Sequence, residues 1–326
     1  MRRMMKIVSA LAFCVLALAS GRATAQDFPS RLVKIVVPYP AGGGVDGLAR
    51  PLAERLSRMW GQPVVVENKP GASTMLGGAD VARAAPDGHT LLFTSDSSIT
   101  SNPHLFKQMS YDPAKELAPI TQLIDLHQLV LLHPSVPAST MKELVALAKE
   151  KPNTLNYGSY GIGSQPHLLF EMLRKEAGAP IQQVPYRGIA PALTAVLTNE
   201  VQMTLGGISV AAGHLQNKTM KPLAISRRAR LPAYLDVPTL AEAGFPNVDP
   251  RSWYGMFTAV GTPPGVIDKI QKDVAAVFAD AEFKARFIDG LGYTGVGSTP
   301  TAFARFIAED MEYKRNLIAV TGITAE

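Results

Sequence analysis

One short segment constrains the fold more than any other: Lys34–Asp46, with the sequence KIVVPYPAGGGVD. Its apolar, β-branched beginning is typical of a buried strand. Two prolines and three consecutive glycines then end the strand, and Leu48–Trp60 has the apolar periodicity of a helix. The first amides of a helix lack internal hydrogen-bond partners, and the helix dipole adds positive charge there. A strand, a glycine turn and a helix start together predict a site for a small anion such as a carboxylate.

The rest of the chain repeats this alternation of short strands and helices. A second glycine turn, Gly158–Ser164, follows a predicted strand and precedes a predicted helix about 120 positions after the first. Alternating strands and helices favour parallel βαβ units, whose ligands bind beyond the carboxyl ends of the strands. We therefore predict an α/β fold of two domains, each a mostly parallel sheet flanked by helices, with the two glycine turns facing one cleft.

The expected domain limits follow from where the pattern of elements restarts. Residues 26–124 plus 250–326 are predicted to form domain 1, and residues 125–249 domain 2. The chain would cross between them near 121–127 and again near 248–254, and these two crossings would form a hinge.

The N-terminus has the composition of a secretory signal peptide. Basic residues come first, an apolar run from Ile7 to Ala19 follows, and Ala23–Ala25 supplies small residues for cleavage after Ala25. The apolar run is too short to cross a bilayer as a helix. Residues 1–25 are thus predicted to direct export to the periplasm.

Removing this segment changes the charge and the cysteine content. Four basic residues and no acidic residue lie within it, so the formal net charge falls from +5 to +1. A nearly neutral chain gives no reason to expect a nucleic-acid partner. The single cysteine, Cys14, also lies in the segment, which leaves no disulfide and no thiolate site in the mature chain. We expect a monomer.

Three other interpretations of these motifs are possible: a dinucleotide-binding site, a purely structural glycine turn and a hydrolase. Gly42–Gly47 matches G-x-G-x-x-G, and Glu67 lies 20 residues further on, as in dinucleotide-binding proteins. The true motif turns directly from strand to glycine, however, whereas Pro38–Pro40 intervenes here. A purely structural glycine turn is the second alternative.

A secreted hydrolase acting on a small ester or amide is the third. Ser159, Ser164 and His167 invite this interpretation, but the chain has no G-x-S-x-G elbow and no acid that we can place beside a base. The six histidines show no metal-ligand spacing. We therefore expect no enzymatic activity, no cofactor and no metal.

Several segments, in order along the chain, carry a family likeness. They are Pro38–Gly44, Gly61–Ala72, Ala85–Leu92, Leu155–Ser159, Val184–Leu193, Asp236–Gly244, Ser252–Gly255 and Gly297–Pro300. In these segments the chain resembles the extracytoplasmic receptors of tripartite tricarboxylate transporters, the Bug family. The resemblance implies a type II-like periplasmic binding protein, which closes like a Venus flytrap on a small carboxylate and delivers it to an integral-membrane permease.

The residue patterns and the resemblance together give a set of candidate ligand contacts. They are Tyr39, Ala41, Gly42, Gly43, Gly44, Ser95, Asp96, Ser97, Ser159, Gly163, Ser164, His167, Arg187 and Gly206.

Three departures from the family pattern bear on the ligand. Gly206–Gly207 stand where many relatives have Asp-Asn, Thr74–Met75 replace a frequent Gly-Asn, and Ile99 replaces a frequent His. Loss of Asp-Asn removes polar groups and volume, so our hypothesis is a bulkier, flatter ligand such as an aromatic mono- or dicarboxylate. Asp96 opposes an anion unless it caps a turn or bonds a ligand hydroxyl or amine.

Overall fold

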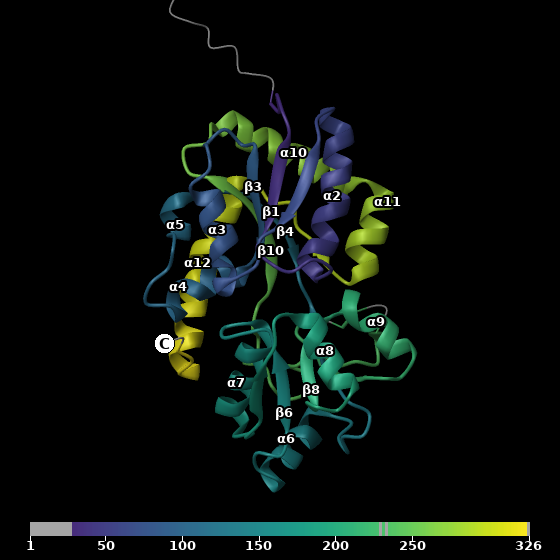
Figure 1. Cartoon of the computed structure of the whole chain (residues 1–326). Coiled ribbons are helices and arrows are strands. Elements are labelled where there is room, and N and C mark those ends of the chain that lie inside the picture. The colour runs from purple at the N-terminus through teal and green to yellow at the C-terminus, as the bar shows by residue number, and fades with distance from the viewer. Residues whose placement is uncertain (1–27, 228–229, 232–233, 325–326) are drawn as a thin grey trace, which may run out of the picture.

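The computed structural model of the chain describes residues 28–227, 230–231 and 234–324. The predicted signal peptide and its cleavage site lie outside these residues. Two β-sheets, each with helices packed on it, form two domains stacked end to end (Figure 1). No helix in the described ranges is long and apolar enough to span a bilayer.

Domain 1 is built on a six-stranded sheet that uses strands from both ends of the chain. Its order is β11 (Thr294–Gly295), β4 (Leu117–Asp125), β10 (Trp253–Ala259), β3 (Thr90–Ser95), β1 (Val33–Val37) and β2 (Val64–Asn68). Strand β1 runs parallel to β2 and β3, whereas β10 runs antiparallel to both β3 and β4.

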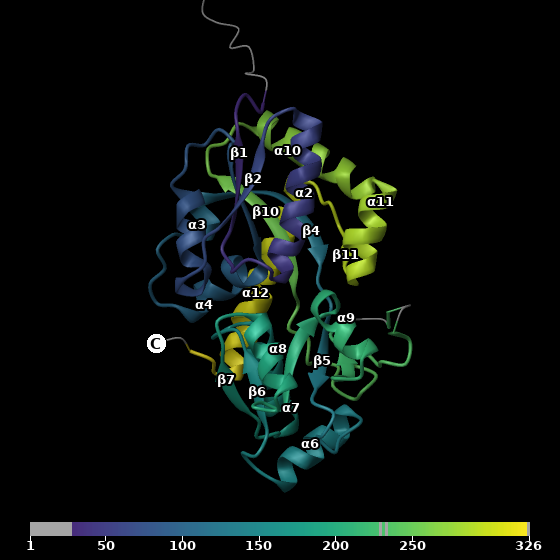
Figure 2. The same ribbon diagram turned by 45° about the vertical axis from the view of Figure 1, so that its right-hand side comes forward.

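Helices cover both faces of this sheet (Figure 2). The helices of domain 1 are α2 (Gly44–Trp60), α3 (Met75–Ala82), α4 (Asn102–Leu105), α5 (Pro113–Glu116), α10 (Pro264–Ala279), α11 (Ala281–Phe283) and α12 (Pro300–Thr321). Alternate residues of β1 enter different cores: Val33, Ile35 and Val37 pack with α2 and α10, and Val36 packs with α3 and α12. This two-residue period is what a strand buried on both faces requires.

Domain 2 is built on a five-stranded sheet. Its order is β7 (Gln182–Pro185), β6 (Asn156–Ser159), β8 (Met203–Gly207), β5 (Gln128–Leu132) and β9 (Lys221–Ile225). The helices around it are α6 (Met141–Glu150), α7 (Gln165–Ala177), α8 (Ile189–Leu197) and α9 (Ile208–Gln216).

The prediction of two α/β domains is confirmed, but the strand directions are more mixed than expected. In domain 2, β6 runs parallel to β7 and β8, while β5 runs antiparallel to β8 and β9. The strands that enter from the other domain, β5 and β10, run in the reverse direction, as does the short edge strand β11, which is antiparallel to β4. A chain that crosses between two sheets enters each from the hinge end, opposite to the βαβ strands already there.

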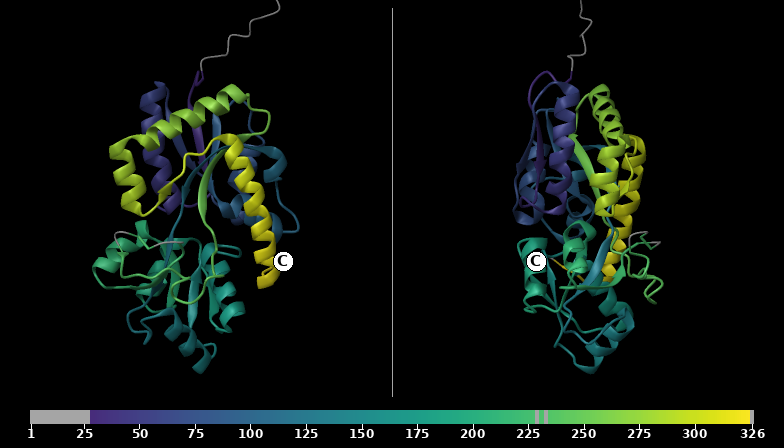
Figure 3. Two further views of the ribbon diagram at one scale, coloured as in Figure 1. Left: turned by 180° about the vertical axis from the view of Figure 1, so that it is seen from behind. Right: turned by 90° about the vertical axis from the view of Figure 1, so that its right-hand side faces the viewer.

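The division of strands between the sheets bears on the proposed domain limits. Strands through Asp125 and from Trp253 onward lie in the first sheet, and those between Gln128 and Ile225 lie in the second. We propose 26–124 plus 250–326 and 125–249 as the two domains, with α12 extending from the first to the second. This helix begins on the sheet of domain 1 and runs on beside domain 2 (Figure 3).

The C-terminal end of α12 and the residues just after it belong to the core of domain 2. Leu317 and Ile318 of the helix and Ile323 beyond it are buried in the same apolar cluster as residues of β5, β6 and α7. Together with the two crossing strands, α12 is a third connection between the domains.

Candidate ligand-binding site

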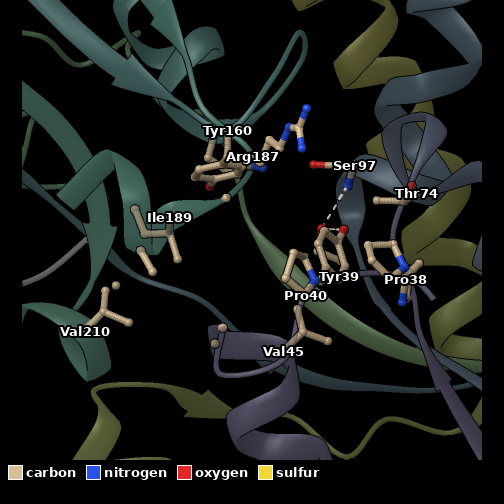
Figure 4. Close-up of a pocket in the computed structure, with 18 of the residues that line it drawn as sticks. Pro38, Tyr39, Pro40, Val45, Thr74, Ser97, Tyr160, Arg187, Ile189 and Val210 are labelled. Atoms are coloured by element: carbon tan, nitrogen blue, oxygen red, sulfur yellow. Dashed lines mark hydrogen bonds between the residues drawn. The ribbon is translucent and has the colours of Figure 1, made fainter. Parts of the chain in front are cut away.

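A cavity of about 590 Å³ lies where the two domains face each other. This volume is within the usual range for small-molecule sites. Domain 1 contributes Pro38–Ala41, Gly43–Val45, the turn around Pro70–Thr74, Ser95 and Ser97. Domain 2 contributes Tyr160, Gln165, Arg187–Pro191, Gly207, Ser209 and Val210, and the crossing strands add Leu126, Gln128, Ser252 and Tyr254. In Figure 4, Tyr39, Pro40 and Val45 lie on one side of the space, and Tyr160, Arg187, Ile189 and Val210 on the other.

The first glycine turn brings the start of α2 to this cavity. The helix begins at Gly44, one turn earlier than the predicted Leu48. Close packing requires glycine at this position, because a Cβ on Gly44 would lie 2.8 Å from the Tyr254 hydroxyl oxygen. Gly43 precedes the helix at φ −78°, and its missing Cβ would meet nothing closer than 3.6 Å. The unpaired amides at this helix start therefore lie at the wall of the cavity.

The predicted contact Gly42 is not among the residues that line the cavity, and its amide is already bonded. Its N–H donates to Asp46 Oδ2 at 2.9 Å, within the first turn of α2. Burial opposes the charge of Asp46, yet Arg50, the Gly42 amide and Asn68 together hold the pKa of this carboxyl below its usual range. Asp46 thus fixes the turn and leaves the later amides of the helix start available.

Hydroxyl groups line the cavity beside this helix start. Tyr39 Oη lies 2.7 Å from Ser95 Oγ and 3.4 Å from Ser98 Oγ. Ser95 Oγ also accepts the Ser97 amide at 3.3 Å. Burial raises the pKa of Tyr39, so its hydroxyl keeps its proton. The predicted contacts Tyr39, Ala41, Gly43, Gly44, Ser95 and Ser97 all line the cavity.

The turn after β2 completes this wall with an unusual backbone. Ala72, Ser73 and Thr74 have φ values of 46°, 50° and 76°, a left-handed conformation that non-glycine residues rarely adopt. Asn102 Nδ2 holds the turn by donating to the Ser73 carbonyl at 2.7 Å, and Ser98 Oγ donates to Thr74 Oγ1 at 2.8 Å. Thr74, which replaces a frequent glycine of the family pattern, therefore lines the cavity in a strained conformation.

The opposite wall is formed by the starts of α8 and α9. Gly188 precedes α8 and Gly207 precedes α9, and both glycines line the cavity. Arg187, next to the first of them, has an exposed side chain. Among the described residues that line the cavity it is the only one with a formal charge. The predicted contact Arg187 is thus placed where a carboxylate could meet it.

The second glycine turn is placed differently from the prediction. Of its residues only Tyr160 lines the cavity, and the predicted contacts Ser159, Gly163 and Ser164 do not. A Cβ on Gly163 would lie 1.9 Å from Leu105 Cδ1 of domain 1, so this turn packs against the other domain. Ser164 Oγ donates to the Gly161 carbonyl at 2.6 Å, and Ser159 Oγ accepts from Gln183 Nε2 at 2.7 Å.

The remaining predicted contacts are also engaged elsewhere. His167 Nδ1 accepts the Gly163 amide at 3.1 Å, and Gly206 lies inside the buried strand β8 beside Leu131. Ile99, where relatives often have His, is buried in the core on the α3 face of domain 1. Because Ser159, Ser164 and His167 each have other partners, they form no nucleophile–base pair in the described part of the chain.

Asp96 is fully buried behind the cavity. Its carboxylate lies 3.1 Å from Lys314 Nζ of α12, which is also fully buried. Burial raises the pKa of Asp96 to about 6, even though Lys314 lowers it. Lys314 Nζ also donates to the Arg251 carbonyl at 2.7 Å in the second crossing strand. Asp96 thus pairs with Lys314 of α12 and accepts a hydrogen bond from Ser252 of the second crossing, which accounts for an acidic residue in this loop.

The sequence analysis missed several residues of the cavity wall. Gly188–Pro191 open α8, Gly207, Ser209 and Val210 open α9, and Gln128, Gln165 and Tyr160 also line the cavity. A sequence signal for this wall exists, since Gly206–Gly207 follow a strand and precede a helix, as the first glycine turn does. Among the described residues no group of three or more His, Cys, Asp or Glu could hold a metal ion.

Two α/β domains that enclose one cavity and are joined by crossing strands define a two-domain solute-binding protein. A family model described as "Tripartite tricarboxylate transporter family receptor" matches residues 48–323, and the chain belongs to this family.

Solved structures agree with this assignment. The periplasmic binding protein BugD is 30% identical, with a TM-score of 0.85 over 92% of this chain and 100% of that one. R. palustris Rpa4515 with adipate is 29% identical, with a TM-score of 0.87 over 91% and 99% of the two chains. MatC from Rhodopseudomonas palustris with bound malate is 28% identical, with a TM-score of 0.83 over 89% and 100%.

Proposed function

We propose that this receptor binds a small carboxylate in the cavity between its domains and delivers it to the membrane permease of a tripartite transporter. The proposal includes export to the periplasm with cleavage after Ala25, action as a monomer, and no enzymatic activity. The observation that carries it is the pairing of an open helix start on one wall with the exposed guanidinium of Arg187 on the other, for which the described residues supply no ion-pair partner. Solved relatives of the chain are complexes with adipate and malate, which are both carboxylates.

The donors around the cavity are sufficient for a physiological affinity. A dissociation constant of about 1 μM requires about 8 kcal/mol. Charged hydrogen bonds contribute about 1.5–3 kcal/mol each. The amides of Gly43–Val45, the hydroxyls of Ser95 and Ser97, and the Arg187 guanidinium are the groups we assign to carboxylate binding. Closure of the domains would exclude water and strengthen each of these contacts.

The space between the two polar walls is apolar. Pro40, Val45, Leu126, Ile189 and Val210 all line it. We propose that this part of the cavity accepts an apolar spacer or an aromatic ring, so that an aromatic mono- or dicarboxylate remains the preferred ligand class.

Native mass spectrometry of freshly purified protein tests the proposal first, because a co-purified acid would be detected directly. Isothermal titration would then compare terephthalate and benzoate with citrate, malate and aspartate. Binding of the aliphatic acids alone would end the aromatic hypothesis, and binding of no acid would end the proposed function. As a matched pair, Arg187→Gln should weaken binding and Arg174→Gln should not, since Arg174 is paired with Glu171 on α7.

A further inference from the structure

Gln165 is the first residue of α7 and has a buried amide group at the wall of the cavity. Its side chain is 2% exposed, and the residue lines the space between the domains. The side-chain nitrogen Nε2 donates to Asp96 Oδ2 of domain 1 at 2.5 Å. This hydrogen bond joins the two domains directly behind the cavity.

The other half of the same amide lacks a partner. Gln165 Oε1 is buried and accepts no hydrogen bond from any described residue. A buried carbonyl oxygen without a donor costs about 1–3 kcal/mol. The oxygen has almost no accessible surface in this structure, so a donor on a ligand reaches it only when the side chain rotates or the domains move slightly around the bound acid.

The orientation of this amide follows from the chemistry of its neighbour. An ionised carboxylate can only accept hydrogen bonds. Asp96 is surrounded by donors, because Lys314 Nζ lies 3.1 Å and Ser252 Oγ 3.4 Å from its oxygens. Only the nitrogen of Gln165 can therefore face Asp96, and the oxygen must point the other way.

Gln128 shows the same arrangement nearby. Its Nε2 lies 3.4 Å from Tyr160 Oη, and its Oε1 is likewise buried without a described partner. Tyr160 Oη also lies close to the backbone amide of Gln165, at the helix start that the second glycine turn was predicted to offer to an anion. This part of the wall thus presents acceptors where the start of α2 presents donors.

We propose that Gln165 Oε1 accepts a hydrogen bond from a hydroxyl or amino group of the ligand, so that the bound acid carries such a donor in addition to its carboxylate. This inference rests on the proposed function and narrows its ligand class. Asp96 is then a positioning residue, since its carboxylate fixes which end of the Gln165 amide meets the ligand.

Matched pairs of acids that differ by one donor test the inference by isothermal titration. Suitable pairs are malate with succinate, and meta- or para-hydroxybenzoate and para-aminobenzoate with benzoate. In the wild-type protein at least one acid with the donor should bind about tenfold more tightly than its partner, the equivalent of one buried hydrogen bond. Gln165→Met should remove this preference and leave the affinity for the acid without the donor within about twofold. Gln183→Met is the matched control, because Gln183 bonds Ser159 outside the cavity.

Asp96→Asn gives an independent measurement on a protein that keeps Gln165. An asparagine can donate as well as accept, so it no longer dictates the orientation of the Gln165 amide. The preference for the acid with the donor should fall several-fold while the other acid still binds. If no pair shows a preference in the wild type, or if the preference survives Gln165→Met, the inference is overturned while carboxylate binding stands. If no acid of either kind binds, the proposed function fails and the inference fails with it.

Discussion

The two glycine turns of this protein have similar sequences and different roles. Gly42–Gly44 leads into α2 and leaves the first amides of that helix at the cavity wall. Gly161–Ser164 leads into α7, but Gly163 packs on Leu105 and the phenol of Tyr160 faces the first amide of the helix. The comparison shows that a glycine turn before a helix predicts an available helix start, and that the neighbouring domain decides whether a ligand can reach it.

The largest expected effect is on binding at the first turn. Gly43→Val should abolish carboxylate binding, because the added side chain enters the space in front of the α2 amides. Folding should be unaffected, since φ at Gly43 is −78° and its Cβ would meet no atom closer than 3.6 Å. Titration calorimetry and a thermal melt measure the two properties separately.

Gly47→Val is the matched control for that variant, because Gly47 lies one turn further along α2 with no atom within 4 Å of its Cβ position. Equal affinity in both variants would remove the first turn from the site.

At the second turn the expected effect is on stability. Gly163→Val should lower the free energy of unfolding by about 3 kcal/mol, because its φ of 71° disfavours a side chain and Leu105 occupies the required space. Urea denaturation measures the change. Combining the variant with Leu105→Ala should recover part of the loss, and a stability equal to that of the wild type would show that the turn is not packed against domain 1.

The buried Asp96 beside the second turn predicts a dependence of stability on pH. Its pKa is raised from 3.8 to about 6 in the folded protein, so its stabilising contribution is present below about pH 4 and is lost as the pH rises through 6. Between about pH 4 and pH 7.5 the wild type should lose up to about 3 kcal/mol relative to Asp96→Asn. Urea denaturation of both proteins at the two pH values measures this difference, and parallel curves would contradict the raised pKa.

Arg187 should make a smaller contribution, because its guanidinium is exposed. Arg187→Gln should weaken carboxylate binding about tenfold at low salt and less at high salt, since screening reduces the interaction of exposed charges. Calorimetry at two ionic strengths measures both effects. An unchanged affinity at low salt would place the carboxylate at the α2 wall alone.

The smallest effect is expected at Ser164. Ser164→Ala removes the hydrogen bond to the Gly161 carbonyl and should cost about 1 kcal/mol of stability without changing affinity. A loss of affinity greater than about threefold would return the second turn to the binding site.

Local patterns were sufficient to predict the alternation of elements, the strand Val33–Val37 and the first glycine turn at a cavity. These features depend on apolar periodicity and on residues close together in the chain. The need for glycine at the start of α2 depends on Tyr254, which is more than 200 residues away and packs against Gly44. No local pattern around Gly44 contains that information.

The roles of the residues around the second glycine turn were not predictable, because they too depend on partners that are distant in the chain. Ser159, Ser164 and His167 look like donors in the sequence, yet each is bonded within domain 2. From the sequence alone, the carboxylate of Asp96 opposes an anionic ligand. In the structure its charge is paired with Lys314, which is more than 200 residues away in the chain. Conversely, Gln165 and Gln128 have no sequence signature, because the unpartnered oxygen of each becomes visible only when both domains are in place.

The position of α12 limits how the two domains can separate when a ligand enters the cavity. Because the helix starts on one sheet and Leu317, Ile318 and Ile323 end in the other core, the domains cannot separate equally on all sides. Either the last two turns detach, exposing apolar side chains to water, or the rotation axis runs along α12 and the mouth widens only on the far side. In the second case the ligand-bound and ligand-free forms would differ by a rotation of one domain about α12. A membrane partner would distinguish the two forms by the orientation of that domain.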